Sequence, residues 1–354
     1  MSRLPVETLA VVVALTDPAT PRLGASLARF ADEAGPTGEV LLVDASGDPA
    51  ADGLARRFAN VRLIRKPAGR LAPELWRDGL LATGADLVAF STAQMTPREG
   101  WMVALRDKLA GSDAACVGGP IEAGSGLSAT DRAVALLRYS GYFPPLPDPD
   151  RVEPPGDNAL YRRDRLMEVE SAWVDGFWEV DVHRALRDRG HSLAMAGSAV
   201  VTFEGGVGLA SMARQRLIHA RRYGAGRSKG IGAMARLARV AACPLVPPLL
   251  CGRIAAALKA RGMGLAPWLP AVPSLLVLAS AWAIGEAAGT CSTSSPLPLG
   301  EGPGVRGAAS PSARKLGLDR RHSTGLDPHP GPLPKGEGGR TVSAPVHDPL
   351  TQLA

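Results

Sequence analysis

The first part of the chain alternates short apolar runs with stretches whose apolar residues recur at helical spacing. The apolar runs are rich in β-branched residues and bounded by polar segments, which is typical of buried strands. The predicted strands cover residues 9–15, 40–43, 61–64, 87–90 and 114–117, and the predicted helices lie near residues 21–33, 48–58, 73–83 and 97–110. This alternation predicts an α/β fold with a mostly parallel sheet and helices on both faces.

The pattern changes after residue 204. Residues 205–263 contain eleven Lys or Arg and no Asp or Glu, so the rest of this chain of net charge +6 is net acidic. Uncharged apolar runs at 240–252 and 262–285 lie within and after the basic block. A basic segment beside apolar runs suits the cytoplasmic side of a membrane that contains anionic lipid. A nucleic-acid-binding arm is the alternative, which the apolar neighbours disfavour, and we expect no nucleic-acid partner.

The two apolar runs differ in length. The second has 24 residues and would measure roughly 36 Å as a helix, enough for a hydrocarbon core of ~30 Å. The first has 13 residues and would measure only about 20 Å. We therefore predict a membrane helix in the second run and a partner helix or re-entrant segment in the first. A pair of buried core helices is the alternative for both.

The last 64 residues include 20 Pro or Gly, and Pro-Leu-Pro-x-Gly-Glu-Gly occurs in them at 296–302 and 332–338. This composition predicts disorder, because it cannot bury enough apolar surface to fold. The predicted organisation is an α/β domain at 1–230, basic juxtamembrane and membrane-associated helices at 231–290, and a disordered Pro/Gly-rich tail at 291–354.

Several classes of protein are disfavoured. The four cysteines stand far apart without a C-x-x-C pair, which argues against a zinc ribbon or a disulfide scaffold and favours reduced thiols. There is no G-x-x-x-x-G-K-[ST] sequence, so a P-loop enzyme is excluded. The first strand–helix junction, residues 15–20, lacks the glycines of a dinucleotide site, which argues against a Rossmann oxidoreductase.

Polar residues gather where ligands bind in parallel sheets, beyond the carboxyl ends of the strands. Asp44, Ser46 and Asp48 follow the second predicted strand. A carboxylate there can accept hydrogen bonds from a ribose or a base, although Ser46 and Asp48 can also cap the next helix. Arg70, after the third strand, either faces phosphates or is solvated.

These residues begin to resemble a family. The order of the elements, the segment 43–48 and the stretch 90–101 are similar to family 2 glycosyltransferases with the GT-A nucleotide-sugar fold. The resemblance implies that Asp44 holds the base or ribose of a nucleoside-diphosphate sugar, and that the fourth strand leads into an Asp-x-Asp motif whose metal ion binds the diphosphate. The Pro97 and Gly100-Trp101 that follow the motif are present, but Thr92 and Gln94 stand in place of the two carboxylates.

The altered motif bears on the cofactor. A hard divalent cation prefers carboxylate oxygens, so Mg²⁺ or Mn²⁺ would be held weakly, with no confident metal ligand, or arginines would bind the diphosphate without a metal. A protein that has lost catalysis is the third reading.

The later motifs supply the remaining site residues. Residues 156–163 resemble the family's small-or-amide segment before a strand, which places Asp157 and Asn158 near the diphosphate or acceptor; an Asx-capped turn is the alternative. The segment 176–181 resembles its acidic motif, which implies that Glu179 is the catalytic base and that Asp181, two residues on, is a second catalytic residue. A base is what inverting transfer requires. The alternative is that both residues are first-turn carboxylates stabilised by the helix dipole.

The last motif lies at residues 215–224. In a helix, Gln215, His219 and Arg222 share one face. The resemblance implies that this segment closes over the diphosphate and acceptor, and a basic juxtamembrane helix is the alternative. The residues assigned to this role are Gln215, Arg216, Arg221 and Arg222. His219, like the other histidines, shows no metal-ligand spacing.

These observations lead to one hypothesis and one alternative. The hypothesis is an inverting, hexosyltransferase-type glycosyltransferase of the cell envelope that transfers a sugar to a lipid or polysaccharide acceptor. It would be attached to the cell (inner) membrane with its catalytic domain facing the cytoplasm. The alternative is a degenerate GT-A module that binds a nucleotide or a partner without turnover.

Overall fold

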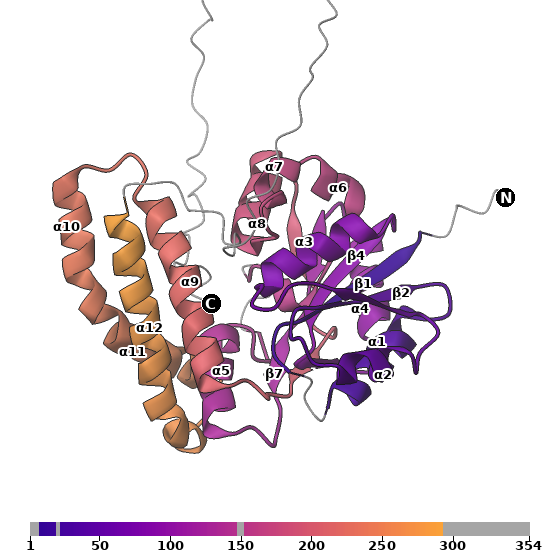
Figure 1. Ribbon diagram of the computed structural model, residues 1–354, viewed down its shortest axis with the longest axis horizontal. Coiled ribbons are helices and arrows are strands. Elements are labelled where there is room, and N and C mark those ends of the chain that lie inside the picture. The colour runs from indigo at the N-terminus through magenta and orange to yellow at the C-terminus, as the bar shows by residue number, and fades with distance from the viewer. Residues whose placement is uncertain (1–6, 19–21, 147–151, 293–354) are drawn as a thin grey trace, which may run out of the picture. The chain divides into compact units, whose positions relative to one another are not determined.

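A seven-stranded sheet is the centre of the fold in the computed structural model, which describes residues 7–18, 22–146 and 152–292 (Figure 1). Its strand order is β3-β2-β1-β4-β8-β6-β9. The strands are β1 (Leu9–Leu15), β2 (Glu39–Asp44), β3 (Val61–Arg65), β4 (Leu87–Thr92), β6 (Cys116–Gly118), β8 (Ala159–Arg162) and β9 (Leu193–Met195). Only β8 pairs antiparallel with its neighbours, so the predicted mostly parallel sheet is confirmed.

The register aligns the carboxyl ends of the central strands. Leu15 at the end of β1 pairs with Asp44 of β2, and Ala14 pairs with Thr92 of β4. Since strands lie about 4.8 Å apart, the ends of β2 and β4 are separated by roughly 10 Å across β1. The residues predicted to bind the donor therefore share one edge of the sheet.

Helices cover both faces of the sheet, as predicted. Alternate residues of β1 point to opposite sides: Val11 and Val13 join one apolar core, whereas Val12 joins the other. The first core contains side chains of α1 (Leu23–Ala34), α2 (Ala50–Ala55), α4 (Trp101–Ala110) and α5 (Ala129–Tyr139). The second contains side chains of α3 (Ala72–Ala82), α6 (Arg163–Met167), α7 (Glu170–Trp173) and α8 (Glu179–Asp188).

A small three-stranded sheet extends the site edge. It has the order β5-β10-β7, formed by β5 (Met95–Pro97), β10 (Val201–Phe203) and β7 (Ile121–Ala123). β5 also explains why the predicted helix at 97–110 begins only at Trp101. Pro97 belongs to this strand and Gly100 has a φ of 76°, a left-handed conformation that glycine adopts without strain.

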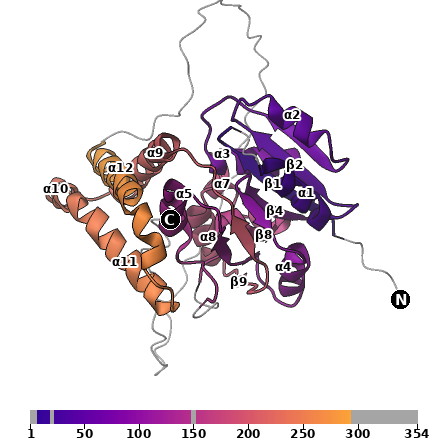
Figure 2. The same ribbon diagram turned by 90° about the horizontal axis from the view of Figure 1, so that it is seen from below.

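Helices α9 to α12 form a layer beside α5 in both views (Figures 1 and 2). They are α9 (Leu209–Arg227), α10 (Ala233–Ala242) and α11 (Val246–Ala260), joined by the short turn η3 (Cys243–Leu245), and α12 (Val272–Cys291), preceded by η4 (Ala266–Ala271). The apolar run at 262–285 is thus not one helix, because Pro267 and Pro270 hold its first part in the 3₁₀ turn η4.

Two helical segments in this layer are long and apolar enough to cross a membrane, residues 233–260 and 266–291, judged by length and composition alone. The predicted disordered tail lies outside the described residues from residue 293 onward. The predicted helix start at residue 21 also lies outside them.

Candidate active site

The nucleotide half of the candidate site lies at the ends of β2 and β3. Asp44 is buried, and its Oδ1 accepts hydrogen bonds from the backbone N–H and the hydroxyl of Ser46, both at 2.7 Å. Its Oδ2 pairs with the guanidinium of Arg65, which also pairs with Asp52. Asp48 Oδ1 accepts from the N–H of Ala50, 2.8 Å away, at the start of α2. Asp44 therefore closes a turn and neutralises Arg65, which is a structural role that its sequence position alone did not reveal.

Cations surround the loop that follows β3. Arg70 pairs with Glu74 at 3.2 Å, and Lys66 Nζ lies 2.9 Å from Asp78 Oδ2. Arg214 of α9 is exposed and reaches the same loop at Gly69. Ser211 also ties the start of α9 to this edge, because its hydroxyl donates to Asp17 Oδ1 at 2.6 Å. The first turns of α9 thus border the loop where a diphosphate would lie.

The residues that the sequence resemblance assigns to a metal-binding motif lie at the carboxyl end of β4. Thr92 ends β4 and Gln94 follows it, and both are buried. They offer a hydroxyl and an amide where a divalent cation favours carboxylates. Within residues 7–18, 22–146 and 152–292, no three His, Cys, Asp or Glu side chains come together as a metal site would require. This set of donors does not fit a hard cation.

The turn η2 (Gly156–Asn158) carries two buried polar residues with different surroundings. Asn158 donates both amide N–H groups, to Pro120 O and Ala199 O at 2.9 Å, and accepts from Trp101 Nε1 at 2.7 Å. It therefore connects the turn before β7, the loop at Ala199 and α4. Both of its donors are used inside the fold, so the structure does not bring this side chain to a ligand.

Asp157, beside it, is only partly satisfied. Its Oδ2 accepts hydrogen bonds from Arg138 Nη2 at 2.8 Å and from the Tyr139 hydroxyl at 2.6 Å. Its Oδ1 is buried and has no hydrogen-bond partner among the described residues. A buried carboxylate oxygen without a donor is rare in folded proteins and needs an explanation.

Glu179 lies directly against this turn, at the first residue of α8. A Cβ added to Gly156 would stand 3.2 Å from the carboxyl carbon of Glu179 and 3.1 Å from the ring of Trp76. Trp76 in turn donates to Ser91 O at the end of β4, and the Ser91 hydroxyl donates to Asp157 O. The missing side chain at Gly156 thus lets the Glu179 carboxyl pack onto η2, beside the carboxyl end of β4.

The environment of Glu179 favours its protonated form near neutrality. Burial raises the pKa of Glu179 to about 7, against the effect of its own backbone N–H, and the negative charge of Asp157 raises it further while Arg138 lowers it. A carboxyl with this pKa is half ionised at neutral pH, so it can take a proton and release it again.

An aromatic and cationic group from α9 faces the start of α8. The Trp178 ring contacts His219 edge-on at 4.8 Å and carries the Arg222 guanidinium 4.4 Å from its centroid. Trp178 Nε1 is buried and has no hydrogen-bond partner within the described part of the chain. Burial and the charges of Arg138, Arg216 and Arg222 lower the pKa of His219 to about 3. The imidazole is therefore neutral at pH 7 and a weaker base than Glu179.

The other predicted site residues on α8 and α9 lie in different environments and do not form one group. Asp181 is partly exposed and lies 3.4 Å from Arg184 and 3.9 Å from Arg222. Gln215 donates to the Ser211 hydroxyl at 3.3 Å. Arg216 and Arg221 are not brought to the site.

These two arginines belong to the side of α9 that meets α12. Arg216 is buried, donates from Nε to Leu278 O at 3.3 Å, and lies 4.7 Å from the Trp282 ring centroid. The backbone of Arg221 packs against Gly289 of α12, and its side chain is exposed.

Sequence reasoning missed Arg138, Trp178, His219 and Arg214 as site residues. Arg138 ends an apolar stretch of α5 and meets Asp157 only in the folded chain. The i, i+4, i+7 spacing of Gln215, His219 and Arg222 was the one usable signal, since it predicted a shared face on α9.

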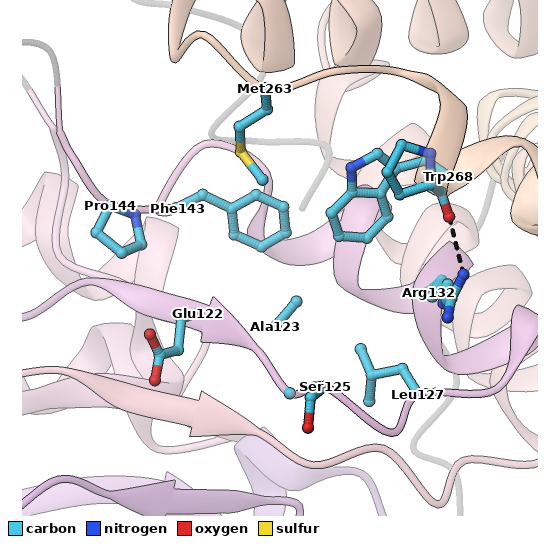
Figure 3. Close-up of a pocket in the computed structure, with 11 residues that line it drawn as sticks. Glu122, Ala123, Ser125, Leu127, Arg132, Phe143, Pro144, Met263 and Trp268 are labelled. Atoms are coloured by element: carbon cyan, nitrogen blue, oxygen red, sulfur yellow. Dashed lines mark hydrogen bonds between the residues drawn. The ribbon is translucent and has the colours of Figure 1, made fainter.

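A hollow lies between β7 and η4, and none of the residues described around Glu179 lines it (Figure 3). It has a volume of about 350 Å³. Phe143 and Trp268 stack across it with centroids 5.7 Å apart, and Arg132 donates to Pro267 O at 2.8 Å, the dashed bond of Figure 3. Met263 adds a further apolar wall.

Comparisons with known proteins are distant. No family model and no curated protein matches the sequence. Among solved structures, the chain is similar to the mannosyltransferase PcManGT from Pyrobaculum calidifontis in complex with GDP-Man and Mn²⁺, with 16% identity, a TM-score of 0.49, and coverage of 78% of this chain and 86% of that one. It is also similar to a mycobacterial protein, with 18% identity, a TM-score of 0.39, and coverage of 60% and 73%. Similarities at this level establish no activity.

Proposed function

We propose that this protein is an inverting glycosyltransferase that uses a nucleoside-diphosphate sugar. Glu179 acts as the base toward the acceptor hydroxyl, and the donor lies along the carboxyl edge of the sheet between Asp44 and Thr92. The proposal rests on the residues of the site together with the sequence resemblance of segments 43–48 and 90–101 to family 2 enzymes.

One observation carries the proposal. Glu179 has a pKa of about 7 and sits at the edge of the parallel sheet. It packs against η2, where a buried carboxylate oxygen of Asp157 has no partner among the described residues. An unsatisfied buried polar atom beside a titrating carboxyl is a frequent feature of binding sites. The hydroxyl group of an acceptor is a hydrogen-bond donor of the kind that this oxygen lacks.

The proposed step is a single displacement at the anomeric carbon. The acceptor oxygen forms its bond to that carbon as the bond to the diphosphate oxygen breaks, and the electron pair leaves with the nucleoside diphosphate. The acceptor proton passes to the Glu179 carboxylate. Negative charge grows on the leaving diphosphate, and cations at the loop after β3, Arg70 and Arg214, stabilise it.

We further propose a lipid-linked acceptor. The hollow lined by Phe143, Met263 and Trp268 offers apolar space. Phe143 of this hollow follows the buried Tyr142, whose pKa is raised by burial and by the charge of Glu179, so the segment that lines the hollow also approaches the catalytic group. Attachment to the inner membrane, with the catalytic domain in the cytoplasm, remains a prediction from the basic block at 205–263.

The test combines donor binding with turnover. The melting temperature of the purified full chain is measured with UDP- and GDP-sugars, with and without Mn²⁺, and nucleoside diphosphate release is then followed with a lipid extract as acceptor. Glu179→Gln should lower turnover about 10²- to 10⁴-fold, the usual contribution of a general base, while leaving the donor-induced shift in melting temperature unchanged.

Asp181→Asn is the matched control. It is two residues away on the same helix, partly exposed and paired with arginines, so it should keep turnover within about tenfold of the parent. Unchanged turnover in the Glu179 variant would remove the base assignment.

A module that binds a nucleotide without turnover is the second candidate, and the hydroxyl and amide at Thr92 and Gln94 favour it. It predicts a donor-induced rise in melting temperature with no release of nucleoside diphosphate under any acceptor condition. Release that stops in an Asp44→Ala variant would exclude it.

A further inference from the structure

We infer that helices α10 to α12 lie flat in one leaflet of a membrane surface that contains anionic lipid, and that neither apolar segment crosses the bilayer. The inference rests on the membrane association proposed above and sets its geometry. It does not depend on sugar transfer, and its test needs no activity.

The protein holds both ends of the first candidate span, residues 233–260. Near its start, Arg236 Nη2 donates to Ser228 O, the C-cap of α9, at 3.1 Å. Just past its end, Arg261 Nε donates to Phe143 O at 3.0 Å. If this segment crossed a hydrocarbon core of ~30 Å, α9, which connects Ser228 to the α/β domain, would have to lie in the core beside it with its five arginines.

The second candidate span, residues 266–291, is held along its whole length. In its first part the Ser274 hydroxyl lies 3.4 Å from that of Thr130 in α5. In its last turns the backbone at Gly289 meets the Arg221 carbonyl of α9 so closely that any Cβ would overlap it. One face of α12 is therefore protein-covered from end to end.

The contact between α9 and α12 is made by glycine. Gly285 and Gly289 of α12 stand four residues apart, and Gly224 of α9 faces the Glu286 carbonyl, again with no room for a Cβ. Small residues at this spacing allow two helix backbones to approach closely. Because α9 carries five arginines, moving α12 into hydrocarbon would carry those charges with it, which a bilayer interior strongly disfavours.

The outer side of the same layer is apolar. Ten of the fourteen exposed large hydrophobic residues in the described part of the chain lie in its segment 233–291. They are Met234, Leu237, Leu245, Leu249, Leu265, Leu269, Val272, Leu276, Val277 and Ile284. An exposed apolar surface gathered on one set of helices marks a contact with lipid or protein.

Helix α10 exposes apolar side chains and directs its arginines toward the protein, the reverse of a helix on a water-facing surface. Met234 and Leu237 on its outer side are 78% and 62% exposed. Arg236 and Arg239 on its inner side donate to the carbonyls of Ser228 and Arg227. A helix on a water-facing surface would present the opposite faces, whereas a helix lying in a lipid interface buries its apolar side in the leaflet.

The positive charge of this segment indicates that lipid, and not a second copy of the chain, covers the exposed apolar face. From residue 205 to residue 285 the sequence has eleven Lys or Arg and no Asp or Glu. Anionic headgroups attract such a segment, whereas a second copy of the chain would bring two equally basic surfaces together. A membrane surface therefore fits both the apolar face and its charge.

The sidedness of four single cysteines tests the inference. The probes are G232C before the first span, G264C between the spans, native Cys291 at the end of α12, and G53C on α2 to mark the catalytic side. The three glycines have no positive φ, and an added Cβ at each meets nothing within 4 Å. Cys243, Cys251 and, except in its own probe, Cys291 are replaced, and Cys116 stays because it is fully buried.

The full chain is bound to sealed anionic vesicles and treated from outside with a membrane-impermeant maleimide. We expect all four positions to label to the same extent before detergent is added. Labelling of position 264 only after detergent, with 53, 232 and 291 labelled before, would mean a spanning hairpin and would overturn the inference.

Vesicle flotation supplies a second measurement, with matched variants. Leu237→Glu and Leu269→Glu remove residues that are each 62% exposed in the layer, and each should weaken binding about tenfold or more. Val103→Glu, 61% exposed on α4, is the control and should bind like the parent. Equal binding of all three variants, or no flotation of the parent with anionic vesicles, would overturn the inference, while transfer to a soluble acceptor would still test the catalytic proposal.

Discussion

The pKa of Glu179 predicts how kcat/KM for sugar transfer depends on pH. Because the base must be ionised to accept a proton, kcat/KM should rise about tenfold per pH unit below pH 7 and level off above it. The pH–rate profile of the parent checks this expectation. An acidic limb near pH 4.5, the ordinary range of an exposed carboxyl, would contradict the raised pKa of the base.

The same titration acts on stability. The pKa is raised from 4.5 in the unfolded chain to about 7 in the folded one, so the folded state binds more protons between these values. The free energy of unfolding should therefore fall as the pH rises from about 4.5 to 7, by on the order of 2 kcal/mol after allowance for partial solvent exposure. Urea unfolding of the parent and of Glu179→Gln, which should lose this slope, measures the effect.

Gly156 should be required for the position of that carboxyl. An added Cβ would press on both Glu179 and Trp76 at 3.1–3.2 Å, so Gly156→Ala should lower kcat about ten- to a hundredfold, as small misplacements of catalytic groups do. Gly84→Ala, where a Cβ meets nothing within 4 Å, is the control for the loss of a glycine. Full kcat in the Gly156 variant would show that the carboxyl does not depend on this contact.

At the scale of helices, the close packing of α9 on α12 predicts that a glycine-to-alanine substitution, which usually stabilises a helix, destabilises the protein at this contact. Gly252→Ala in α11, with open space at its Cβ, should stabilise by about 0.5–1 kcal/mol, as expected in a helix. Gly289→Ala in α12 should instead destabilise by roughly 1–3 kcal/mol, because the methyl group overlaps the Arg221 carbonyl. Urea unfolding of the two variants measures both signs, and stabilisation by both would refute the close approach of the helices.

The strands differed in how well the sequence revealed them. Strands β1 to β4 were predicted to within two residues at each end, because a buried parallel strand forms a continuous apolar run. The strands β5, β7, β9 and β10 have only three residues each, and they lack the longer apolar run, residues 114–117, that revealed the equally short β6. The start of α4 was predicted four residues early because the local pattern does not reveal that Pro97 pairs with Val201 of β10.

Some features of the candidate site could be predicted from the sequence, and others could not. The edge of the sheet and the shared face of Gln215, His219 and Arg222 follow from local spacing. The meeting of Arg138 with Asp157, and the engagement of Asn158 with Trp101, depend on tertiary contacts that no local pattern contains. The roles assigned to Asp44 and Glu179 stay predictions until a donor complex and the variants test them.

At the scale of the whole molecule, the charge asymmetry predicts how salt acts on membrane binding. The range of electrostatic attraction falls from about 10 Å at 0.1 M salt to less than half of that near 0.5 M. Binding of the full chain to anionic vesicles should weaken about tenfold over this range without vanishing, since the apolar face remains. Flotation at increasing NaCl tests this, with uncharged vesicles as the control; salt-independent binding to both would mean that the basic block makes no contact with lipid.

Helix α9 has one further consequence. Its side with His219 and Arg222 borders the catalytic group, and its opposite side rests on α12. On a bilayer, the reaction centre would then stand at a fixed height, about one helix diameter or ~10 Å above the layer embedded in the leaflet. Acceptors whose reactive hydroxyl lies at that height could react. Acceptors whose hydroxyl lies deeper in the leaflet or far out in the solvent could not, so the diameter of α9 would select substrates by the height of their hydroxyl group.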